Sequence, residues 1–207
     1  MTSNPEMARL LDTVGAAMWE HVARHTGRVG YRRGAKAEGL LADPQVIDCS
    51  GWVTLLLRAG MTAADRGRVP APFEEDDRRA VDTWSDRMIA ELERRFGFLL
   101  EGDRISLEAL PPYATIGLCQ GGGEWATNRP RPRGITHIVQ LVRRPCDDAA
   151  FVSEAQGWDE PTGIRLTPLS DWLDMTREHL TLGRAWAVDA FGALGAARHL
   201  TPPRPTL

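Results

Sequence analysis

Apolar residues recur every three to four positions in the first part of the chain, and they form shorter runs in the later part. The first such repeat predicts a helix that Asn4 caps, with Pro5 and Glu6 in its first turn, and that Gly27 ends. Its apolar stripe consists of Met7, Leu10, Leu11, Val14 and Met18.

Two further helices are predicted before residue 100. One begins near Asp48 and Cys49 and ends at Gly60; it is apolar nearly all round, so we expect it to be buried. The next spans residues 75–96, with acidic residues first and Arg94 and Arg95 last, as the helix dipole favours. The Gly- and Pro-containing segments 28–45 and 61–73 are predicted to be loops. The stripe of the helix over 75–96 consists of Val81, Trp84, Met88, Leu92 and Phe96.

The pattern changes after Gly97, where short apolar runs predict strands rather than helices. One later helix is predicted, from Ser170, which caps it, to about Leu180. Helices that precede strands are typical of an α+β domain, and 207 residues suit a single one. We expect residues 200–207, which contain Pro-Pro-Arg-Pro, to form a loose tail. The predicted strands are 113–119, 135–143, 149–155, 163–167 and 184–191.

Composition and charge narrow the function classes. With 43% hydrophobic and 26% charged residues, the chain as a whole is neither disordered nor a coiled coil. Its 25 basic and 28 acidic residues give a formal net charge of −3, so nucleic acid is not an expected partner. No run of about 18 apolar residues is present, so no membrane partner is expected. Lys36 is the only lysine, which we interpret as a consequence of genomic base composition.

The cysteines and the first residues bear on location and cofactors. Cys49, Cys119 and Cys146 form neither a disulfide framework nor a zinc motif, so no cofactor and no metal is expected. We interpret Cys119 as a core thiol and Cys146 as a turn thiol. The first dozen residues lack a basic segment followed by an apolar run, so no secretory signal is predicted. The chain is expected to be cytoplasmic as synthesised.

The segment VIDCSGWV, residues 46–53, carries the strongest chemical signal. It places Cys49 in the first turn of a buried helix, where backbone N–H groups favour a thiolate and can hold a developing oxyanion. Gly51 would leave room for a substrate backbone above the sulfur. The alternative is that Cys49 packs in the core as a small hydrophobic residue.

A nucleophilic cysteine needs a base, and the five histidines differ in their placement. His21 and His25 lie on the first predicted helix and would face solvent, while His179 ends the late helix and His199 lies in the tail. His137 alone falls within a predicted strand, GITHIVQLV, among apolar residues. It is therefore either a positioned base or a core histidine whose hydrogen bonds are satisfied.

These residues resemble the catalytic motif of the NlpC/P60 family of cell-wall cysteine peptidases, which are papain-like in a minimal form. The resemblance covers roughly residues 8–60 and 110–190 and includes DCSG followed by an aromatic residue and Val. It implies a helix that carries the nucleophile Cys49 at its start, packed on a small antiparallel sheet that carries the base His137. Tyr31 matches the tyrosine that precedes the cysteine motif. The segment 61–105 would be a helical insertion that could wall the cleft.

The sequence departs from that family in two places. PPYATIGLC stands where the family has a strand like Gly-Asp-Leu-Val, and the position twelve residues after His137 is Ala149, which cannot orient an imidazole. The polar candidates for the third residue are Glu154, which we favour, and Gln156, both on one face of their strand. A Glu followed two residues later by an amide also resembles the related CHAP amidases. The alternative is that both residues are solvated at a strand end.

The residues beside the nucleophile have two interpretations. The resemblance implies that Asp48 and Ser50 line the substrate site and contact its charged groups, whereas Asp48 is also a good helix cap. The expected activity is hydrolysis of an amide bond in peptidoglycan stem peptides, of the D-glutamyl–diamino acid endopeptidase type. The alternatives are a CHAP-type N-acetylmuramoyl-L-alanine amidase, a Cys–His acyltransferase on the same scaffold, or a non-catalytic binding module.

The resemblance also bears on partners and on the place of action. The expected partner is peptidoglycan or a muropeptide. A wall hydrolase made without a signal could recycle imported wall peptides, or could reach the periplasm or cell wall through a phage or a secretion machine. If it were a secreted toxin, an immunity or delivery protein would be a further partner.

Overall fold

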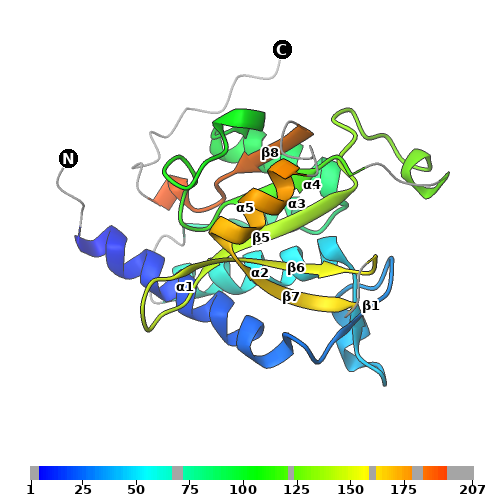
Figure 1. Ribbon diagram of the computed structural model, residues 1–207. Helices are drawn as coiled ribbons and strands as arrows, with labels where there is room; N and C mark the ends of the chain where they lie inside the picture. Colours follow the sequence, from blue (N-terminus) through cyan, green and yellow to red (C-terminus); the bar gives the residue numbers. More distant parts are fainter. Residues whose placement is uncertain (1–4, 67–71, 121–123, 159–161, 179–183, 195–207) are drawn as a thin grey trace, which may run out of the picture.

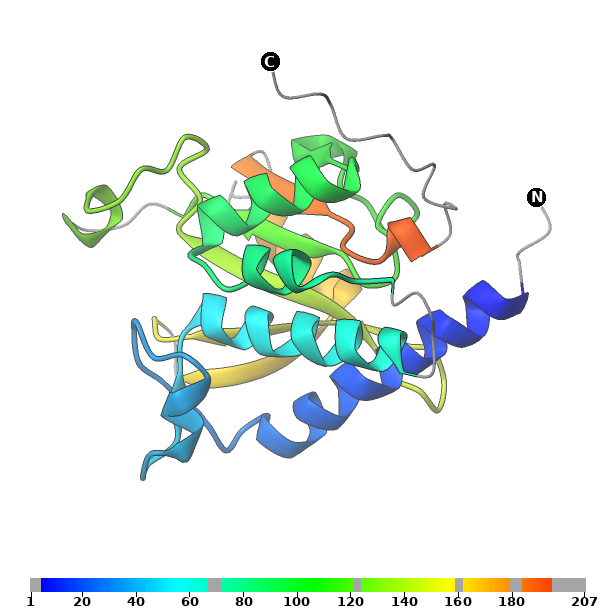
Figure 2. The same ribbon diagram turned by 180° about the vertical axis from the view of Figure 1, so that it is seen from behind.

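The computed structural model describes residues 5–66, 72–120, 124–158, 162–178 and 184–194. It has a mixed α+β fold in which a sheet lies between two helical layers (Figures 1 and 2). Helices α1 to α4 cover one face of the sheet, and α5 covers the other. The helices are α1 (Pro5–His25), α2 (Cys49–Asp65), α3 (Glu75–Ala80), α4 (Ser85–Phe96) and α5 (Leu169–Glu178).

The sheet has six strands in the order β3-β8-β4-β5-β6-β7, and every neighbouring pair is antiparallel. The three strands β5, β6 and β7 follow one another as two hairpins, whereas β8 returns from late in the chain and lies between β3 and β4. The strands are β3 (Leu100–Glu101), β4 (Thr115–Leu118), β5 (His137–Arg143), β6 (Ala150–Gln156), β7 (Gly163–Pro168) and β8 (Ala185–Val188).

Each face of the sheet has its own apolar core because successive strand residues point to opposite faces. Ile138 and Val142 of β5 pack with residues of α1, α2 and α4, and Val139 and Leu141 pack with Trp172 and other residues of α5. The predicted α+β class, with an antiparallel sheet, is therefore confirmed at this level.

The first two helices form largely as predicted. Helix α1 ends at His25, and Gly27 follows in the left-handed region at φ 71°. Helix α2 begins at Cys49 but continues to Asp65, so the predicted end at Gly60 is wrong. A Cβ on Gly60 would lie 2.7 Å from Phe191, so this glycine serves close packing rather than chain termination.

The single helix predicted over residues 75–96 is also wrong, because the segment divides into α3 and α4. The Thr54 hydroxyl of α2 donates to the carbonyl of Val81 at 2.5 Å, where a continuous helix would use that carbonyl internally. Helix α4 then restarts at Ser85 with Trp84 as its N-cap residue.

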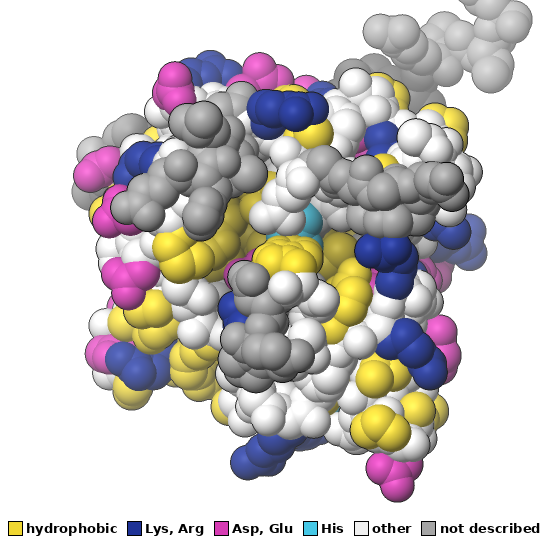
Figure 3. All heavy atoms as spheres, turned by 45° about the vertical axis from the view of Figure 1, so that its right-hand side comes forward, with side chains coloured by type: hydrophobic (Ala, Val, Ile, Leu, Met, Phe, Trp, Pro, Cys, Tyr) yellow, Lys and Arg dark blue, Asp and Glu magenta, His cyan; other side chains and the backbone are white. Residues whose placement is uncertain are grey.

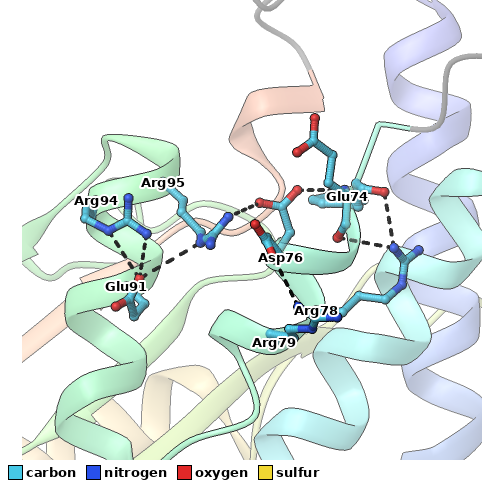
Figure 4. A network of polar contacts seen from close by, with 9 residues as sticks. Glu74, Asp76, Arg78, Arg79, Glu91, Arg94 and Arg95 are labelled. Atoms are coloured by element: carbon cyan, nitrogen blue, oxygen red, sulfur yellow. Dashed lines mark hydrogen bonds and ion pairs between the residues drawn. The ribbon is translucent and has the colours of Figure 1, made fainter. Parts of the chain in front are cut away.

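A network of ion pairs joins α3 to α4 (Figure 4), and a further ion pair joins α3 to the end of α2. The buried Asp77 accepts from Arg95 of α4 at 2.9 Å and from the backbone N–H of Glu74 at 2.8 Å. Arg78 pairs with Asp65 at the end of α2. These contacts tie the last turn of α4 to α3, and α3 to the end of α2.

The segment 28–45, predicted to be a loop, contains ordered structure. Strand β1 (Gly30–Tyr31) pairs in parallel with β2 (Val46–Ile47), and a 3-10 helix spans Ala37–Leu41. Two-residue strands are too short to produce a periodic pattern, which is why the sequence did not predict them. Their pairing brings Tyr31 opposite Ile47, two residues before Cys49.

The remaining domain predictions have mixed outcomes. The predicted insertion 61–105 is helical over α3 and α4, but it also contains the last residues of α2 and strand β3, which belongs to the central sheet. The predicted late helix is α5, which begins at Leu169 and is described to Glu178. The predicted tail at 200–207 lies outside the described residues.

Candidate active site

Cys49 is the first residue of α2, and Asp48 is its N-cap residue, as the sequence predicts for a helix start. The Asp48 carboxylate accepts the backbone N–H of Gly51 at 2.6 Å and that of Gly34 at 3.0 Å. Cys49 is buried, with 9% of its surface exposed. The sulfur therefore lies in the first turn, where the positive end of the helix dipole stabilises a thiolate.

His137 lies between Cys49 and Glu154. It opens β5, Glu154 lies on the neighbouring strand β6, and both side chains are buried. The His137 Nε2 is 2.7 Å from Glu154 Oε2, and the side chain of Cys49 is close enough to the ring to raise its pKa. Because Glu154 occupies Nε2, Nδ1 is the nitrogen left for the sulfur. The three side chains therefore form a chain of sulfur, imidazole and carboxylate.

The surroundings favour the charged form of the imidazole. Burial lowers the pKa of His137, but the proximity of Cys49 and Glu154 outweighs it and raises the pKa to about 9. The raised pKa favours the imidazolium, which donates from Nε2 to the Glu154 carboxylate.

Gln156, the alternative third residue, lies at the end of β6 and is 2% exposed. Its Nε2 has no hydrogen-bond partner among the described residues. The alternative that Glu154 and Gln156 are solvated is wrong, since Glu154 is only 7% exposed. Of these two candidates, Glu154 is the one in contact with the imidazole at Nε2.

Two aromatic residues frame the pair of His137 and Cys49. The rings of Trp158 and His137 meet edge to face, with their centroids 4.6 Å apart and their planes at 85°. Trp158 is 51% exposed, so it separates the imidazole from solvent on one side. The Tyr31 ring lies against Gly157, where a Cβ would come within 2.4 Å of it. Burial, followed by the proximity of Cys49 and Asp48, raises the pKa of Tyr31 to about 12, so its hydroxyl stays protonated.

Lys36 belongs to the site, although no pattern in the sequence predicts this. Its ammonium donates to both carboxylate oxygens of Asp48, at 3.1 and 3.2 Å, and to the hydroxyl of Ser50. The interpretation of this lone lysine as a matter of genomic composition is therefore incomplete. The one available signal was its rarity, since all other basic residues are arginines.

A cavity of about 180 Å³ opens beside Cys49. Figure 3 shows the side of the molecule near β1, where the surface is hollowed and a histidine side chain is visible between hydrophobic ones. Residues at the start of α4 contribute to the wall of this cavity, so part of the predicted insertion does line it. The cavity is lined by Tyr31, Arg33, Gly34, Lys36, Asp48, Cys49, Ser50, Trp84, Ser85, Asn128, Arg129, Arg131 and Thr136.

Gly51 has a different role from the one predicted. A Cβ at this position would lie 2.9 Å from the carbonyl oxygen of Ala35 and 3.1 Å from Cα of Lys36. Gly51 therefore gives room to the protein's own loop, which packs on the start of α2, and not to a substrate backbone.

The other histidines and cysteines lie elsewhere. His21 and His25 are half-buried on α1, and His25 packs against Trp52 with ring centroids 5.9 Å apart, so the expectation that both face solvent is wrong. His179 and His199 lie outside the described residues. Cys119 is buried and Cys146 is exposed, in agreement with the predicted core and turn thiols.

Comparison of the chain with protein-family models, curated proteins and solved structures gave no match. Within the part of the chain that the structure describes, no helix has the length and apolar character needed to cross a membrane. The functional argument therefore rests on the geometry around Cys49.

Proposed function

We propose that the protein is a cysteine hydrolase that cleaves amide bonds in peptidoglycan stem peptides. The observation that carries the proposal is the grouping of Cys49, at a helix N-terminus beside a cavity, with His137 and the Glu154 carboxylate that contacts its ring at 2.7 Å. A core cysteine needs neither a charged imidazole nor a buried carboxylate next to it. Burying two ionisable groups is costly, so their pairing favours a chemical role.

The proposed reaction has two stages. The Cys49 thiolate attacks the amide carbonyl carbon, while backbone N–H groups at the start of α2 and the protonated Tyr31 hydroxyl stabilise the oxyanion. The C–N bond then breaks, and the His137 imidazolium gives its proton to the leaving amine, which leaves a thioester and a neutral imidazole. Water attacks the thioester carbonyl, His137 takes the water proton, and the acid and the Cys49 thiolate are released. Glu154 keeps the imidazole oriented and stabilises its charged form.

The arrangement of elements supports a papain-like fold of the NlpC/P60 type. A helix with the cysteine at its start packs on an antiparallel sheet, and neighbouring strands supply the histidine and the third residue. The substrate class follows from this resemblance and from the DCSGWV motif. We propose the bond between D-glutamate and the diamino acid as the preferred site of cleavage.

One observation favours a second candidate, a CHAP-type amidase that cuts between N-acetylmuramic acid and L-alanine. The residue on the imidazole is Glu154, and a second buried polar residue, Gln156, follows it on the same strand. A Glu followed two residues later by an amide resembles the CHAP family rather than the NlpC/P60 family. The two candidates share the chemistry of Cys49 and differ only in the bond that is cut.

Digestion of purified peptidoglycan, with product identification by mass spectrometry, tests the proposal. The wild-type protein should release fragments with a new amino terminus at the diamino acid, whereas an amidase would expose that of L-alanine. Cys49→Ala should abolish release. Cys119→Ala, a buried cysteine that does not line the cavity, is the matched control and should retain most of it. Undiminished release by Cys49→Ala would refute the mechanism, and release by neither protein would refute the function.

A further inference from the structure

The segment in front of β5 is irregular, although it leads directly into His137. Residues 129–136 belong to no helix or strand, and the two prolines among them have no backbone N–H to donate. β4 pairs with residues 137–140 of β5, whereas the pairing with β6 covers residues 140–143. The backbone at His137 therefore depends on what holds the segment in front of it as well as on β4.

Asp86, in the first turn of α4, holds this segment. It is 2% exposed, and its Oδ2 accepts the backbone N–H groups of Arg133 at 3.1 Å and of Ile135 at 2.9 Å. A carboxylate is a strong acceptor, because its charge strengthens each hydrogen bond that it receives. Ile135 is fully buried and lies two residues before His137, so the contact acts close to the imidazole.

Ser85 adds a second contact from the same turn of α4. Its hydroxyl donates to the carbonyl of Ile135 at 3.2 Å and accepts from the guanidinium of Arg131 at 3.2 Å. That guanidinium also donates to the carbonyl of Ile135, at 2.7 Å. Both backbone polar groups of Ile135 are therefore bound, the N–H by Asp86 and the carbonyl by Ser85 and Arg131.

Close packing brings α4 and this segment onto β4 at the same place. A Cβ on Gly117 of β4 would lie 2.8 Å from a side-chain carbon of Ile89 and 2.9 Å from one of Ile135. Gly117 pairs with Ile138, the residue that follows His137. The start of β5 is therefore enclosed by β4 and α4, and a shift of α4 would be transmitted to it.

We propose that Asp86 is a positioning residue that sets the place of His137 in the proposed reaction. It acts through Ile135, whose fixed backbone keeps the imidazole beside Cys49 and Glu154. The inference rests on the proposed function for the use of the imidazole, but the placement of the ring can be measured without a substrate. It gives α4, part of the predicted helical insertion, a role in the site beyond lining the cavity.

The titration of the His137 ring, followed by NMR with isotope-labelled histidine, reports its placement. The proximity of Cys49 and Glu154 raises the pKa of this ring to about 9, so a ring that moves away from them should titrate closer to 6.5. The signal that disappears in His137→Gln identifies it among the five histidines. Asp86→Ala removes the acceptor of both N–H groups, and we expect the midpoint of the titration to fall by about 1 or more.

Three variants separate positioning from stability. Asp86→Asn keeps an oxygen that can accept the same two N–H groups, so it should restore most of the wild-type midpoint. The matched control, Asp77→Ala, removes another buried carboxylate, which pairs with the last turn of α4, and should leave the midpoint unchanged. Ser85→Ala covers the case in which Asp86→Ala fails to fold, and it should lower the midpoint by about 0.5.

The outcomes for the midpoint decide the inference. An unchanged midpoint in Asp86→Ala, or in Ser85→Ala if the former does not fold, would overturn it. An equal fall in Asp77→Ala would overturn it as well, because the effect would then follow from lower stability. A wild-type midpoint near 6.5 would also overturn it, since the ring would not be held beside Cys49 and Glu154.

Turnover of peptidoglycan is measured separately and tests the proposed function. Asp86→Ala should lower turnover about tenfold, because a small displacement of a catalytic group is costly. A lowered midpoint in Asp86→Ala, with no release of fragments by the wild-type protein, would support the positioning role and refute the hydrolase. Release by the wild-type protein with an unchanged midpoint in Asp86→Ala would do the reverse.

Discussion

Replacing Glu154 by glutamine should alter how the free energy of unfolding depends on pH. In the folded protein the pKa of His137 is raised from 6.5 to about 9, against the effect of burial, by Cys49 and Glu154. The folded state therefore binds this proton more tightly than the unfolded state. The resulting stabilisation is complete below about pH 6.5 and is lost as the pH rises through about 9.

The size of the effect follows from the same values. A pKa difference of 9 − 6.5 = 2.5 corresponds to about 3 kcal/mol at 1.36 kcal/mol for each pKa unit. Cys49 and Glu154 both contribute to this stabilisation, so the charge of Glu154 accounts for a part of it, on the order of 1 kcal/mol. Glutamine keeps the size of the side chain and removes its charge. The wild-type protein should therefore exceed Glu154→Gln in stability by about 1 kcal/mol near pH 6, and by much less above about pH 9.

Urea unfolding of both proteins at several pH values measures this difference. Groups that titrate equally in the two proteins cancel when their free energies are subtracted, which isolates the contribution of the pair of His137 and Glu154. Glu101→Gln, at an exposed position on β3, is the control and should give a pH-independent difference near zero. A gap between wild type and Glu154→Gln that stays constant from about pH 6 to above 9 would refute the proposed charge pairing.

Three further outcomes are expected. Near pH 6, iodoacetamide should modify the buried Cys49 about tenfold faster than the exposed Cys146, as peptide mapping would show, because Cys49 is the first residue of α2, a position that favours a reactive sulfur. Faster modification of Cys146 would contradict this. Trp158→Ala should lower the turnover of peptidoglycan about tenfold while leaving Cys49 alkylation intact, because water would reach the imidazole; unchanged turnover would show that the ring contact is incidental. Asp77→Ala should reduce the free energy of unfolding by about 3 kcal/mol in urea titrations, because a buried acceptor shared by α3 and α4 is lost. Asp76 is exposed, so Asp76→Ala should change the free energy of unfolding by less than about 0.5 kcal/mol.

The sequence predicted those parts of the fold in which apolar residues repeat at regular spacing. Long helices such as α1 repeat their apolar residues often enough to be recognised, and β5 and β6 are long enough to show runs of apolar residues. The break between α3 and α4 depends on Thr54, which lies 27 residues before Val81 in the chain, so no local pattern reveals it. Propensity and periodicity describe neighbours in sequence, and this break is caused by a neighbour in space.

The residues of the candidate site were likewise predicted only in part. Cys49 was identified because its helix start is visible in the sequence, and His137 because it alone lies inside a strand pattern. Glu154 was favoured over Gln156 by analogy, and the structure gives it the contact with the imidazole. Lys36 was missed because its importance arises from the pairing of β1 with β2, which folds the loop that carries it onto Asp48.

The position of β8 has a consequence for the order in which the chain assembles during synthesis. Cys49, His137 and Glu154 all precede residue 168, so the helix and the two hairpins that hold them can form before β8 leaves the ribosome. Until then the edge of β4 that later pairs with β8 has no partner in the sheet, and an open edge is prone to pair with other chains. Pairing of β3 with β8 joins residue 100 to residue 187, a long loop closure that we expect to be slow. The growing chain would therefore acquire its reactive centre before its protected surface, which makes that interval the one in which aggregation competes with folding.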